Sequence, residues 1–360
     1  MTMSRPLSAT TSYERLAAAG VRAQLARIEE LVTSTRAAVD AIASGTVDQS
    51  TLGALAANVI PRWHFSMLND RERNDAYATA LERQVVPGSH VLDIGSGSGL
   101  LALAAARAGA GRVTTCEANP LLAEVARQII DTQGLTDRIT VLATHSSAIE
   151  IGREIATPAD MVISEIVDCG LVGEGILPSI RHARRELLAP DGTILPQGAK
   201  LYGQLMESSA VQRLNHVEVA CGFDVSLMNA LATHGHFPTR LATWPHCALS
   251  APVELLSFDF TRDVPEQQNR SVSFEPTTSG TAHAVVAWFE LDLGAGVVLR
   301  TTPDNTATHW MQAFLPFPAP VEVAAGRSIE VELRCVSTRL SATPTRVCTE
   351  APSTTQEATR

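Results

Sequence analysis

Hydrophobic residues between positions 13 and 44 recur at alternating spacings of three and four. The apolar positions of this stripe are Val21, Leu25, Ile28, Val32, Val39 and Ile42, with Thr35 in the one gap. Such spacing puts the side chains on one face of a helix, so the pattern predicts a helix over residues 13–44. We expect the stripe to pack against the protein's own body rather than against a partner helix.

From residue 89 the pattern changes to short apolar runs that alternate with helical segments. Strands are predicted at residues 91–94, 112–117, 139–142 and 160–164, and helices at 100–108, 120–132 and 181–188. Close alternation of this kind predicts a parallel, doubly wound α/β sheet of Rossmann-like type. We place this domain at residues 61–195, after an N-terminal helical segment at residues 1–60.

Beyond residue 196 the pattern of apolar and polar residues is typical of antiparallel strands. They are predicted at residues 199–206, 253–260, 282–293, 296–300 and 329–336. A polar, partly helical insert at about 208–244 separates the first two. We take residues 196–348 as a second domain, and the Thr/Ser/Glu-rich residues 349–360 as a disordered tail.

Composition and charge limit the classes of partner that the protein is expected to bind. The 360 residues carry 28 Lys and Arg against 38 Asp and Glu, a net charge of −10. An acidic surface repels phosphate backbones, so no nucleic-acid partner is expected. The longest apolar run is too short to span a bilayer, and the first 15 residues lack the apolar core of a signal peptide. A cytoplasmic protein without a membrane partner is therefore predicted.

Two residue types add smaller points. All basic residues except Lys200 are arginine, and with the alanine-rich composition this indicates a GC-rich, bacterial genome. The six cysteines are scattered without a Cys-x-x-Cys pair, so no metal site and no disulfide framework is predicted.

A glycine-rich segment follows the first predicted strand of the sheet. Asp93, Gly95 and Gly97 belong to Asp-Ile-Gly-Ser-Gly-Ser-Gly at residues 93–99, which opens a helix. Glu117 ends the next strand, where an acid can bind a ribose diol. The glycine spacing differs from that of dinucleotide sites and resembles S-adenosylmethionine (SAM) methyltransferases. The alternative is a tight turn with a solvated Glu117.

Two glutamates, Glu165 and Glu174, lie nine residues apart in a loop that follows the strand at 160–164. Ligand sites of doubly wound sheets lie at such strand ends. A pair of carboxylates suits a planar cation such as guanidinium. Taken singly, Glu165 could cap the following helix and Glu174 could be a solvated loop acid.

Residues from about 61 to 315 resemble the protein arginine methyltransferase family. Glu165 and Glu174 match its double-Glu loop, and Thr308-His309-Trp310 matches its threonine-histidine-tryptophan loop. Residues 63–70 with Arg73 and Asn74 resemble the helix that covers the cofactor. The resemblance implies transfer of a methyl group from SAM to an arginine guanidino group. It also implies that the second domain is an antiparallel, β-barrel-like substrate domain.

By position, the resemblance implies a set of cofactor residues. Arg73 would bind the SAM carboxylate, Glu117 the ribose, and Met67 would lie near the sulfonium. The remaining members of the predicted cofactor set are His64, Asp93, Gly95, Gly97 and Ser147, of which Ser147 stands where the family places an acid near the adenine.

The resemblance likewise implies the reacting residues. Glu165 and Glu174 would clamp the guanidinium, and His309 and Trp310 would close the substrate pocket. His309 would also relay the proton that leaves the nitrogen. Four further histidines, at 145, 234, 236 and 246, are expected to be surface residues.

The residue before the second glutamate bears on the product. Family members that dimethylate asymmetrically carry a bulky aromatic there, whereas this chain has Gly173. It therefore resembles the symmetric-dimethylating and monomethylating branches, and monomethylation is favoured.

For the substrate we favour free L-arginine, giving Nω-methyl-L-arginine. Free-arginine methyltransferases of this family occur in bacterial natural-product pathways that make nitrosoureas of the streptozotocin type. Arginine in Arg/Gly-rich protein segments is the alternative, and an amine methyltransferase or a non-catalytic SAM-fold scaffold is the next. The insert at 208–244 occupies the place of the family's dimerisation arm, so a homodimer is predicted.

Overall fold

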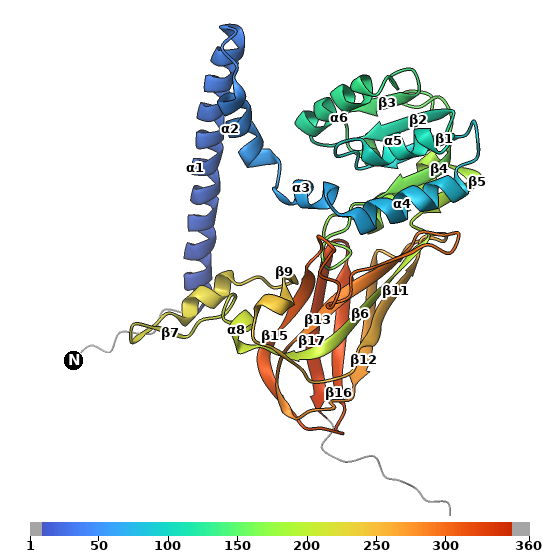
Figure 1. Ribbon diagram of the computed structural model, residues 1–360. Coiled ribbons are helices and arrows are strands. Elements are labelled where there is room, and N and C mark those ends of the chain that lie inside the picture. Colours follow the sequence, from blue (N-terminus) through green and yellow to red (C-terminus); the bar gives the residue numbers. More distant parts are fainter. Residues whose placement is uncertain (1–8, 348–360) are drawn as a thin grey trace, which may run out of the picture. The chain divides into compact units, whose positions relative to one another are not determined.

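A computed structural model of the chain describes residues 9–347 (Figure 1). The tail predicted at 349–360 lies outside the described residues. Contacts divide the chain into two compact units, residues 1–62 and residues 63–360, and each is described by itself.

The first unit is a pair of helices, α1 (Ala9–Ala43) and α2 (Gln49–Val59). The Asp48 carboxylate caps α2 by accepting the Thr51 N–H at 2.9 Å. Helix α1 contains the predicted helix, but the apolar stripe is not covered by this unit. Its members are 43% exposed at Val32 and 64% exposed at Ile42, and Ala38 is the one buried apolar residue among those described in the unit. The expected packing of the stripe is therefore absent within this unit.

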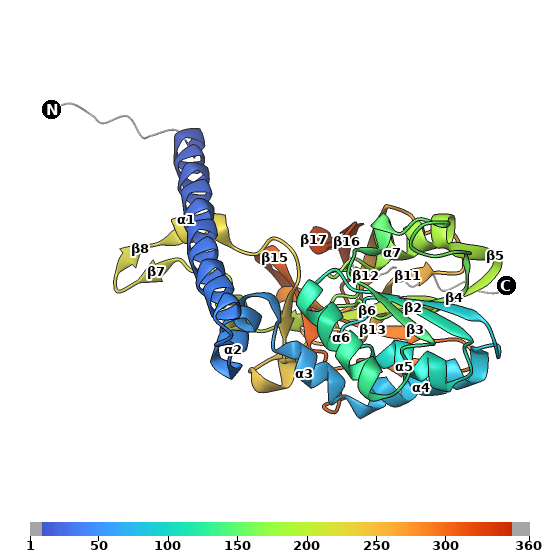
Figure 2. The same cartoon turned by 90° about the horizontal axis from the view of Figure 1, so that it is seen from above.

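The second unit begins with α3 (Trp63–Leu68) and α4 (Arg71–Gln84), and continues into a parallel sheet. Its strands are β1 (His90–Ile94), β2 (Arg112–Cys116), β3 (Ile139–Leu142), β4 (Ala159–Ser164) and β5 (Leu188–Leu195). The strand order is β3-β2-β1-β4-β5. Helices α5 (Leu100–Arg107) and α6 (Pro120–Thr132) pack against β1 to β3 (Figure 2). The predicted doubly wound sheet is confirmed.

One part of this domain differs from the prediction. The helix expected at 181–188 starts earlier, as α7 (Ile176–His182), and ends in a π-helical turn (Ala183–Leu187). Residues 188–195, which contain the predicted helix stop Pro-Asp-Gly, form the fifth strand. Strand β5 lies at the sheet edge, where proline is tolerated, and its pairing with β4 skips from Leu188 to Thr193. The Pro190–Gly192 segment thus leaves the ladder without ending the strand.

The second domain is antiparallel and barrel-like, as the resemblance implied (Figure 1). Its larger sheet contains β6 (Gly198–Glu207), β9 (Phe237–Thr239), β10 (Cys247–Ala248), β11 (Val253–Asp259), β13 (Gly280–Asp292), β14 (Val298–Arg300) and β15 (Gln312–Val323). The smaller sheet contains β12 (Gln267–Phe274), β16 (Ile329–Val336) and β17 (Arg339–Val347). In these two sheets, strands β9, β10, β12, β15 and β17 were not predicted.

The insert at 208–244 has little regular structure. It holds α8 (Ser209–Gln212), a hairpin of β7 (Val219–Ala220) and β8 (Phe223–Asp224), and 3₁₀ turns at Ser226–Leu231 and Leu241–Thr243. Large apolar side chains on it are 56 to 72% exposed, namely Leu214, Val219, Phe223, Leu227, Met228 and Leu231. An apolar surface of this kind is typical of an interface.

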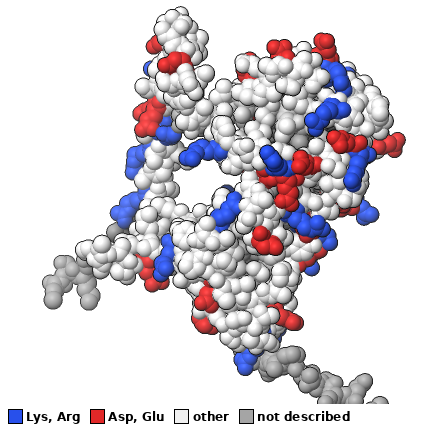
Figure 3. Space-filling view, viewed as in Figure 1, with Lys and Arg blue, Asp and Glu red and all other residues white. Residues whose placement is uncertain are grey.

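Two further observations concern the surface. Acidic and basic side chains are interspersed on the face in Figure 3, so the net charge of −10 is not gathered in one patch there. Among the described helices, none has the length and apolarity that crossing a bilayer requires.

Phe289 on β13 provides a test of the packing in the core of the second domain. Its ring is fully buried and meets the Trp310 ring edge-on, with centroids 5.3 Å apart. Because truncation leaves a cavity, Phe289→Ala should lower the free energy of unfolding by about 3–5 kcal/mol, measured by urea denaturation. Val86→Ala is the control, because Val86 is 68% exposed, and it should leave the midpoint unchanged. Equal midpoints for the two variants would contradict the described core.

Candidate active site

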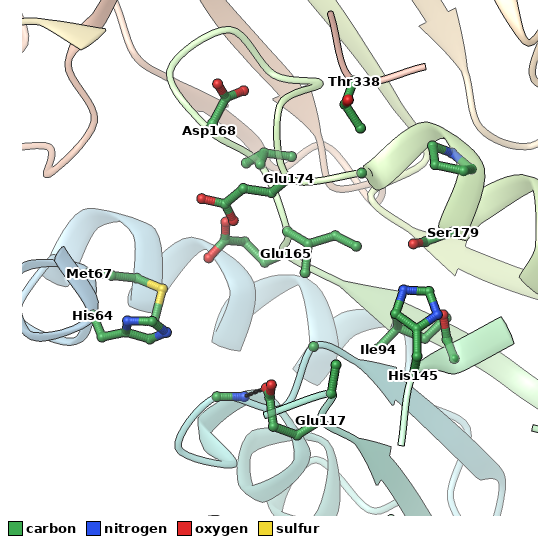
Figure 4. A pocket seen from close by; sticks show the side chains of 18 of the residues that line it. His64, Met67, Ile94, Glu117, His145, Glu165, Asp168, Glu174, Ser179 and Thr338 are labelled. Carbon is green, nitrogen blue, oxygen red and sulfur yellow. Dashed lines mark hydrogen bonds between the residues drawn. The ribbon is translucent and has the colours of Figure 1, made fainter. Parts of the chain in front are cut away.

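A cavity of about 790 Å³ opens at the carboxyl ends of the parallel strands (Figure 4). It lies where β1 is flanked by β2 on one side and β4 on the other, which is the point at which the strand order reverses. Ligands of doubly wound sheets bind at this point. The walls come from α3, the glycine-rich loop, residues 144–147, the loop after β4, α7 and residues 309–311.

The glycine-rich loop brings backbone close to the cavity. Gly95 has φ +87°, and a Cβ there would overlap the Ile166 side chain. Glu117, just after β2, accepts the Gly97 N–H at 2.9 Å and the Asn119 N–H at 2.8 Å. Glu117 thereby fixes the loop, and its carboxylate lines the cavity.

Asp93 and Ser147 have different surroundings. Asp93 is fully buried, accepts the Thr115 hydroxyl at 2.7 Å and does not line the cavity. Burial raises the pKa of Asp93 to about 7. Ser147 lies on the cavity wall with its hydroxyl 2.8 Å from His145 Nδ1. The structure therefore places Ser147 with the predicted cofactor residues and Asp93 behind them.

The loop between β4 and α7 brings Glu165 and Glu174 together. Their carboxylates lie side by side at the cavity in Figure 4. Glu174 is exposed at the cavity, and desolvation of its carboxylate by the cavity walls raises its pKa to about 7, to which the negative charges of Glu165 and Asp168 add. No described residue donates a hydrogen bond to the Glu174 carboxylate. The carboxylate is open to solvent through the cavity. A cation placed between the two glutamates would relieve this concentration of negative charge.

Arg73 is paired with Glu165. Its Nε lies 2.6 Å from Glu165 Oε2, and an Nη atom bonds the same oxygen. The two side chains are 4% and 3% exposed, and Arg73 does not line the cavity. The predicted contact partner of the SAM carboxylate thus lies one layer behind the wall, bound to the first glutamate.

Asp70 connects α4 to the loop of Thr308, His309 and Trp310. One of its oxygens caps α4 through the Arg73 N–H at 3.0 Å. The other accepts the Thr308 hydroxyl at 3.1 Å and the His309 N–H at 2.8 Å, and lies 2.9 Å from His309 Nδ1. Burial opposes ionisation, but these hydrogen bonds and the charge of His309 lower the pKa of Asp70 to about 2. Asp70 is therefore a fixed carboxylate that orients His309.

Trp310, His64 and Met67 complete the predicted set. The Trp310 indole N–H donates to the Val167 carbonyl at 3.0 Å, which ties its loop to the loop of the two glutamates. His64 and Met67 project from α3 toward the cavity (Figure 4). All three line the cavity, so of the predicted site residues only Arg73 and Asp93 do not.

Several cavity residues were not predicted. Ser179, His182 and Thr338 line it, and so does His145, which is exposed at its edge. Of these, Thr338 comes from the turn between β16 and β17, far along the chain, and no local motif marks it.

His236 is not the surface residue that was expected. Its side chain is 6% exposed, and its Nε2 lies 2.5 Å from Asp168 Oδ2. His234 and His246 are exposed, as expected.

Asp168, Cys169 and His236 form one cluster of metal-ligand type among the described residues. Two ligands of a tetrahedral zinc ion lie about 3.3 Å apart, because each is about 2.0–2.2 Å from the metal. The 2.5 Å between His236 and Asp168 is shorter, and is a hydrogen-bond distance. The cluster is thus a hydrogen-bonded pair beside the buried thiol of Cys169.

The geometry can be compared with known proteins. Residues 197–349 match the family model described as "Arginine methyltransferase oligomerization subdomain". Residues 77–198 match that of "Ribosomal protein L11 methyltransferase (PrmA)". The arginine N(omega)-methyltransferase of Streptomyces achromogenes subsp. streptozoticus is 53% identical over 288 residues, which are 80% of each chain.

The chain belongs to the protein arginine methyltransferase family. Further relatives are the protein arginine N-methyltransferase 7 of Oryza sativa subsp. indica, 33% identical, and the protein arginine N-methyltransferase 1.6 of Arabidopsis thaliana, 32% identical. These matches cover 69% and 73% of this chain but only 37% and 38% of the relatives. The chain thus spans well under half the length of these two relatives.

Solved structures of this family share the fold. The Trypanosoma brucei PRMT1 enzyme-prozyme heterotetrameric complex with AdoHcy has a TM-score of 0.68 at 25% identity, over 78% of this chain and 90% of that one. The Arabidopsis thaliana protein arginine methyltransferase 10 has a TM-score of 0.62 at 22% identity, over 74% and 86%.

This family member is a SAM-dependent methyltransferase, and its residues fit that cofactor. The cavity lies within the range of small-molecule sites, about 300–1,000 Å³. The loop at Gly95 has no room for a side chain, so ligand and backbone can meet closely there. Glu117 supplies a carboxylate for a ribose diol at the end of β2.

The raised pKa of Glu174 predicts a pH-dependent effect on stability. An acid with a folded pKa near 7 and an ordinary value of 4.5 binds an extra proton in the native state between these values. Its contribution is therefore favourable at low pH and is lost as the pH rises from 4.5 to 7. Glu174→Gln should match the wild-type Tm at pH 5 and exceed it at pH 8, measured by calorimetry.

Asp93 also has a pKa raised to about 7 and would change stability over the same pH range. Because Asp93 is present in both the wild type and the Glu174→Gln variant, comparing the two proteins at each pH controls for it. Its effect cancels when the two Tm values are subtracted at each pH. A wild-type protein that is more stable than the variant at pH 8 would contradict the raised pKa.

Proposed function

We propose that the protein methylates the guanidino group of free L-arginine with SAM and releases Nω-methyl-L-arginine. The observation that carries this proposal is the pairing of Glu165 and Glu174 at one cavity with the glycine-rich loop and Glu117. Roles of individual residues below are part of the proposal.

Guanidinium suits this pair of glutamates on physical grounds. It is planar, stays charged at all physiological pH values and forms parallel N–H···O bonds to carboxylates. Arg73 already bonds Glu165 through Oε2, and the described residues leave Oε1 without a hydrogen bond. In the proposal, Glu165 Oε1 and the Glu174 carboxylate bind the substrate from two sides, while Arg73 prevents Glu165 from turning away.

The chemistry then follows from positioning. SAM would supply an electrophilic methyl group when bound in the cavity. Glu165 and Glu174 would hold the guanidino nitrogen in an orientation from which it can attack that group. By attracting positive charge onto the other two nitrogens, they leave electron density on the attacking one, which is electrostatic preorganisation.

In the proposal, His309 accepts the proton that the nitrogen loses on methylation. Asp70 bonds its backbone N–H and lies 2.9 Å from Nδ1, so Nε2 is the atom left for this transfer. Asp70 is ionised throughout, because its pKa is about 2, and it stabilises the charged imidazole ring that results.

Similarity to a named relative supports free arginine over protein arginine. The relative named for arginine is 53% identical over 80% of its own length. The two sequence relatives named for protein arginine are 33% and 32% identical over under half of theirs, and the protein arginine methyltransferase 10 structure is only 22% identical. The product with one methyl group is favoured because Gly173 precedes the second glutamate. The place in a bacterial biosynthetic pathway and the cytoplasmic location stay predictions.

A homodimer is also part of the proposal. The match to an oligomerisation subdomain includes the insert at 208–244, and large exposed side chains such as Phe223 and Leu231 give it an apolar surface. We expect light scattering at micromolar protein to report twice the chain mass of 38.3 kDa. A monomer at that concentration would overturn the assignment.

The substrate is tested by mass spectrometry of purified protein with SAM and either free L-arginine or an Arg-Gly-Gly peptide. Each methyl group adds about 14 Da, and the proposal expects one on free arginine and none on the peptide. Methylation of the peptide alone would make the protein an enzyme for protein arginine and overturn the proposal.

The paired glutamates are tested by Glu174→Gln. It should bind SAM as the wild type does, by calorimetry, but lose at least about 100-fold in kcat because an amide lacks the charge that holds the guanidinium. Glu150→Gln is the matched control, since Glu150 is a loop acid 68% exposed to solvent. Near-normal turnover by Glu174→Gln would refute the two-glutamate mechanism.

A further inference from the structure

A second His–Asp pair lies next to the loop of the two glutamates. His236 comes directly before β9, and its imidazole lies against Gly170 with Nε2 2.5 Å from Asp168 Oδ2. Its Nδ1 is buried and has no partner among the described residues. A buried imidazole is therefore held by a single strong hydrogen bond, and that bond goes to the loop.

Asp168 determines the path of the chain between the two glutamates. Its Oδ1 accepts the Gly173 N–H at 2.8 Å and the Gly170 N–H at 3.2 Å. Its carbonyl accepts the Leu171 N–H at 3.0 Å, and Leu171 has φ +74°. Because Gly173 is the residue before Glu174, the position of Asp168 sets the direction from which Glu174 enters the cavity.

Two glycines make this arrangement sterically feasible. A Cβ at Gly173 would overlap the Asp168 carboxylate, and a Cβ at Gly170 would overlap the His236 ring. The loop is thus shaped around the pair, and the pair fills space that side chains at 170 and 173 would otherwise take.

His236 belongs to the segment that closes the insert. Within the insert, Asn215 and Thr233 are joined by two hydrogen bonds of 2.9 and 2.8 Å, which bring its early and late parts together. Three residues later the His236 N–H donates to the Leu340 carbonyl at 3.1 Å, beside the turn that carries Thr338. His236 is therefore fixed from the insert and from the barrel, and not from the loop alone.

We propose that His236 is a positioning residue for the reaction: through Asp168 it sets the place of Glu174, and so connects the insert at 208–244 to the acid loop. This rests on the proposed role of Glu174. His236 itself touches neither substrate nor cofactor in this arrangement.

The test compares three variants. His236→Phe keeps a ring but removes the donor, His236→Gln keeps an N–H donor at the reach of Nε2, and His246→Phe is the matched control at an exposed histidine. Misplacing Glu174 by a fraction of an ångström should lower kcat on free L-arginine about 10- to 100-fold in His236→Phe. SAM affinity should be unchanged, since the loop at Gly95 and Glu117 is not involved. His236→Gln should recover most of the lost rate.

Hydrogen exchange gives a readout that does not depend on the substrate. The backbone amides of residues 165–175 should exchange about tenfold faster in His236→Phe than in the wild type, and at wild-type rates in His236→Gln and His246→Phe. If the wild type methylates no arginine, the proposed function fails while the exchange result still decides whether His236 fixes the loop.

Two outcomes would overturn the inference. One is unchanged loop exchange together with a kcat equal to that of the control. The other is loss of SAM affinity and of thermal stability in His236→Phe without rescue by glutamine, because that pattern indicates a general structural role rather than positioning of Glu174.

Discussion

The buried ion pair of Arg73 and Glu165 is the interaction on which the arrangement of the site depends. A carboxylate withdrawn from water costs several kcal/mol unless it is paired and hydrogen-bonded. Arg73 meets that requirement from the first turn of α4, which Asp70 caps. The same Asp70 holds Thr308 and His309. One helical turn therefore links the end of β4, the helices before the sheet and a loop of the barrel.

Negative charge in the cavity follows from this arrangement. Glu165 is paired with Arg73 behind the cavity wall. Desolvation, together with the charges of Glu165 and Asp168, raises the pKa of Glu174 to about 7. The two carboxylates therefore differ, since the protein supplies a cation to Glu165, whereas negative charges lie next to Glu174.

Much of the fold was predictable because local signals agreed with tertiary structure. Strands β1 and β4 are mostly apolar and are buried at every position but Asp160, as expected for strands covered on both faces. The failures come from prolines and polar residues at places where pairing tolerates them. Strand β5 contains Pro190 at a sheet edge, and β15 contains Pro316, Pro318 and Pro320. Most side chains of β12 are exposed to solvent. The apolar stripe of α1 predicted the helix, but the sequence pattern carries no information on which surface packs against the stripe.

The candidate site was also predictable only in part. Glu117, Glu165 and Glu174 follow strands, and their positions at strand ends could be inferred from order and spacing. The pairing of Arg73 with Glu165 could not be inferred, because a contact between two side chains 92 residues apart leaves no trace in local sequence. His236 and Asp168, 68 residues apart, escaped for the same reason.

The close fit of Gly173 to Asp168 constrains how the family's product specificity can change in this lineage. Members that dimethylate asymmetrically carry a bulky aromatic at the position of Gly173. Here that substitution would collide with Asp168, and removing Asp168 alone would leave His236 and two glycine N–H groups without their acceptor. Position 173 is therefore coupled to a residue 63 positions away, because room for a side chain there requires moving the carboxylate to which His236 is bonded.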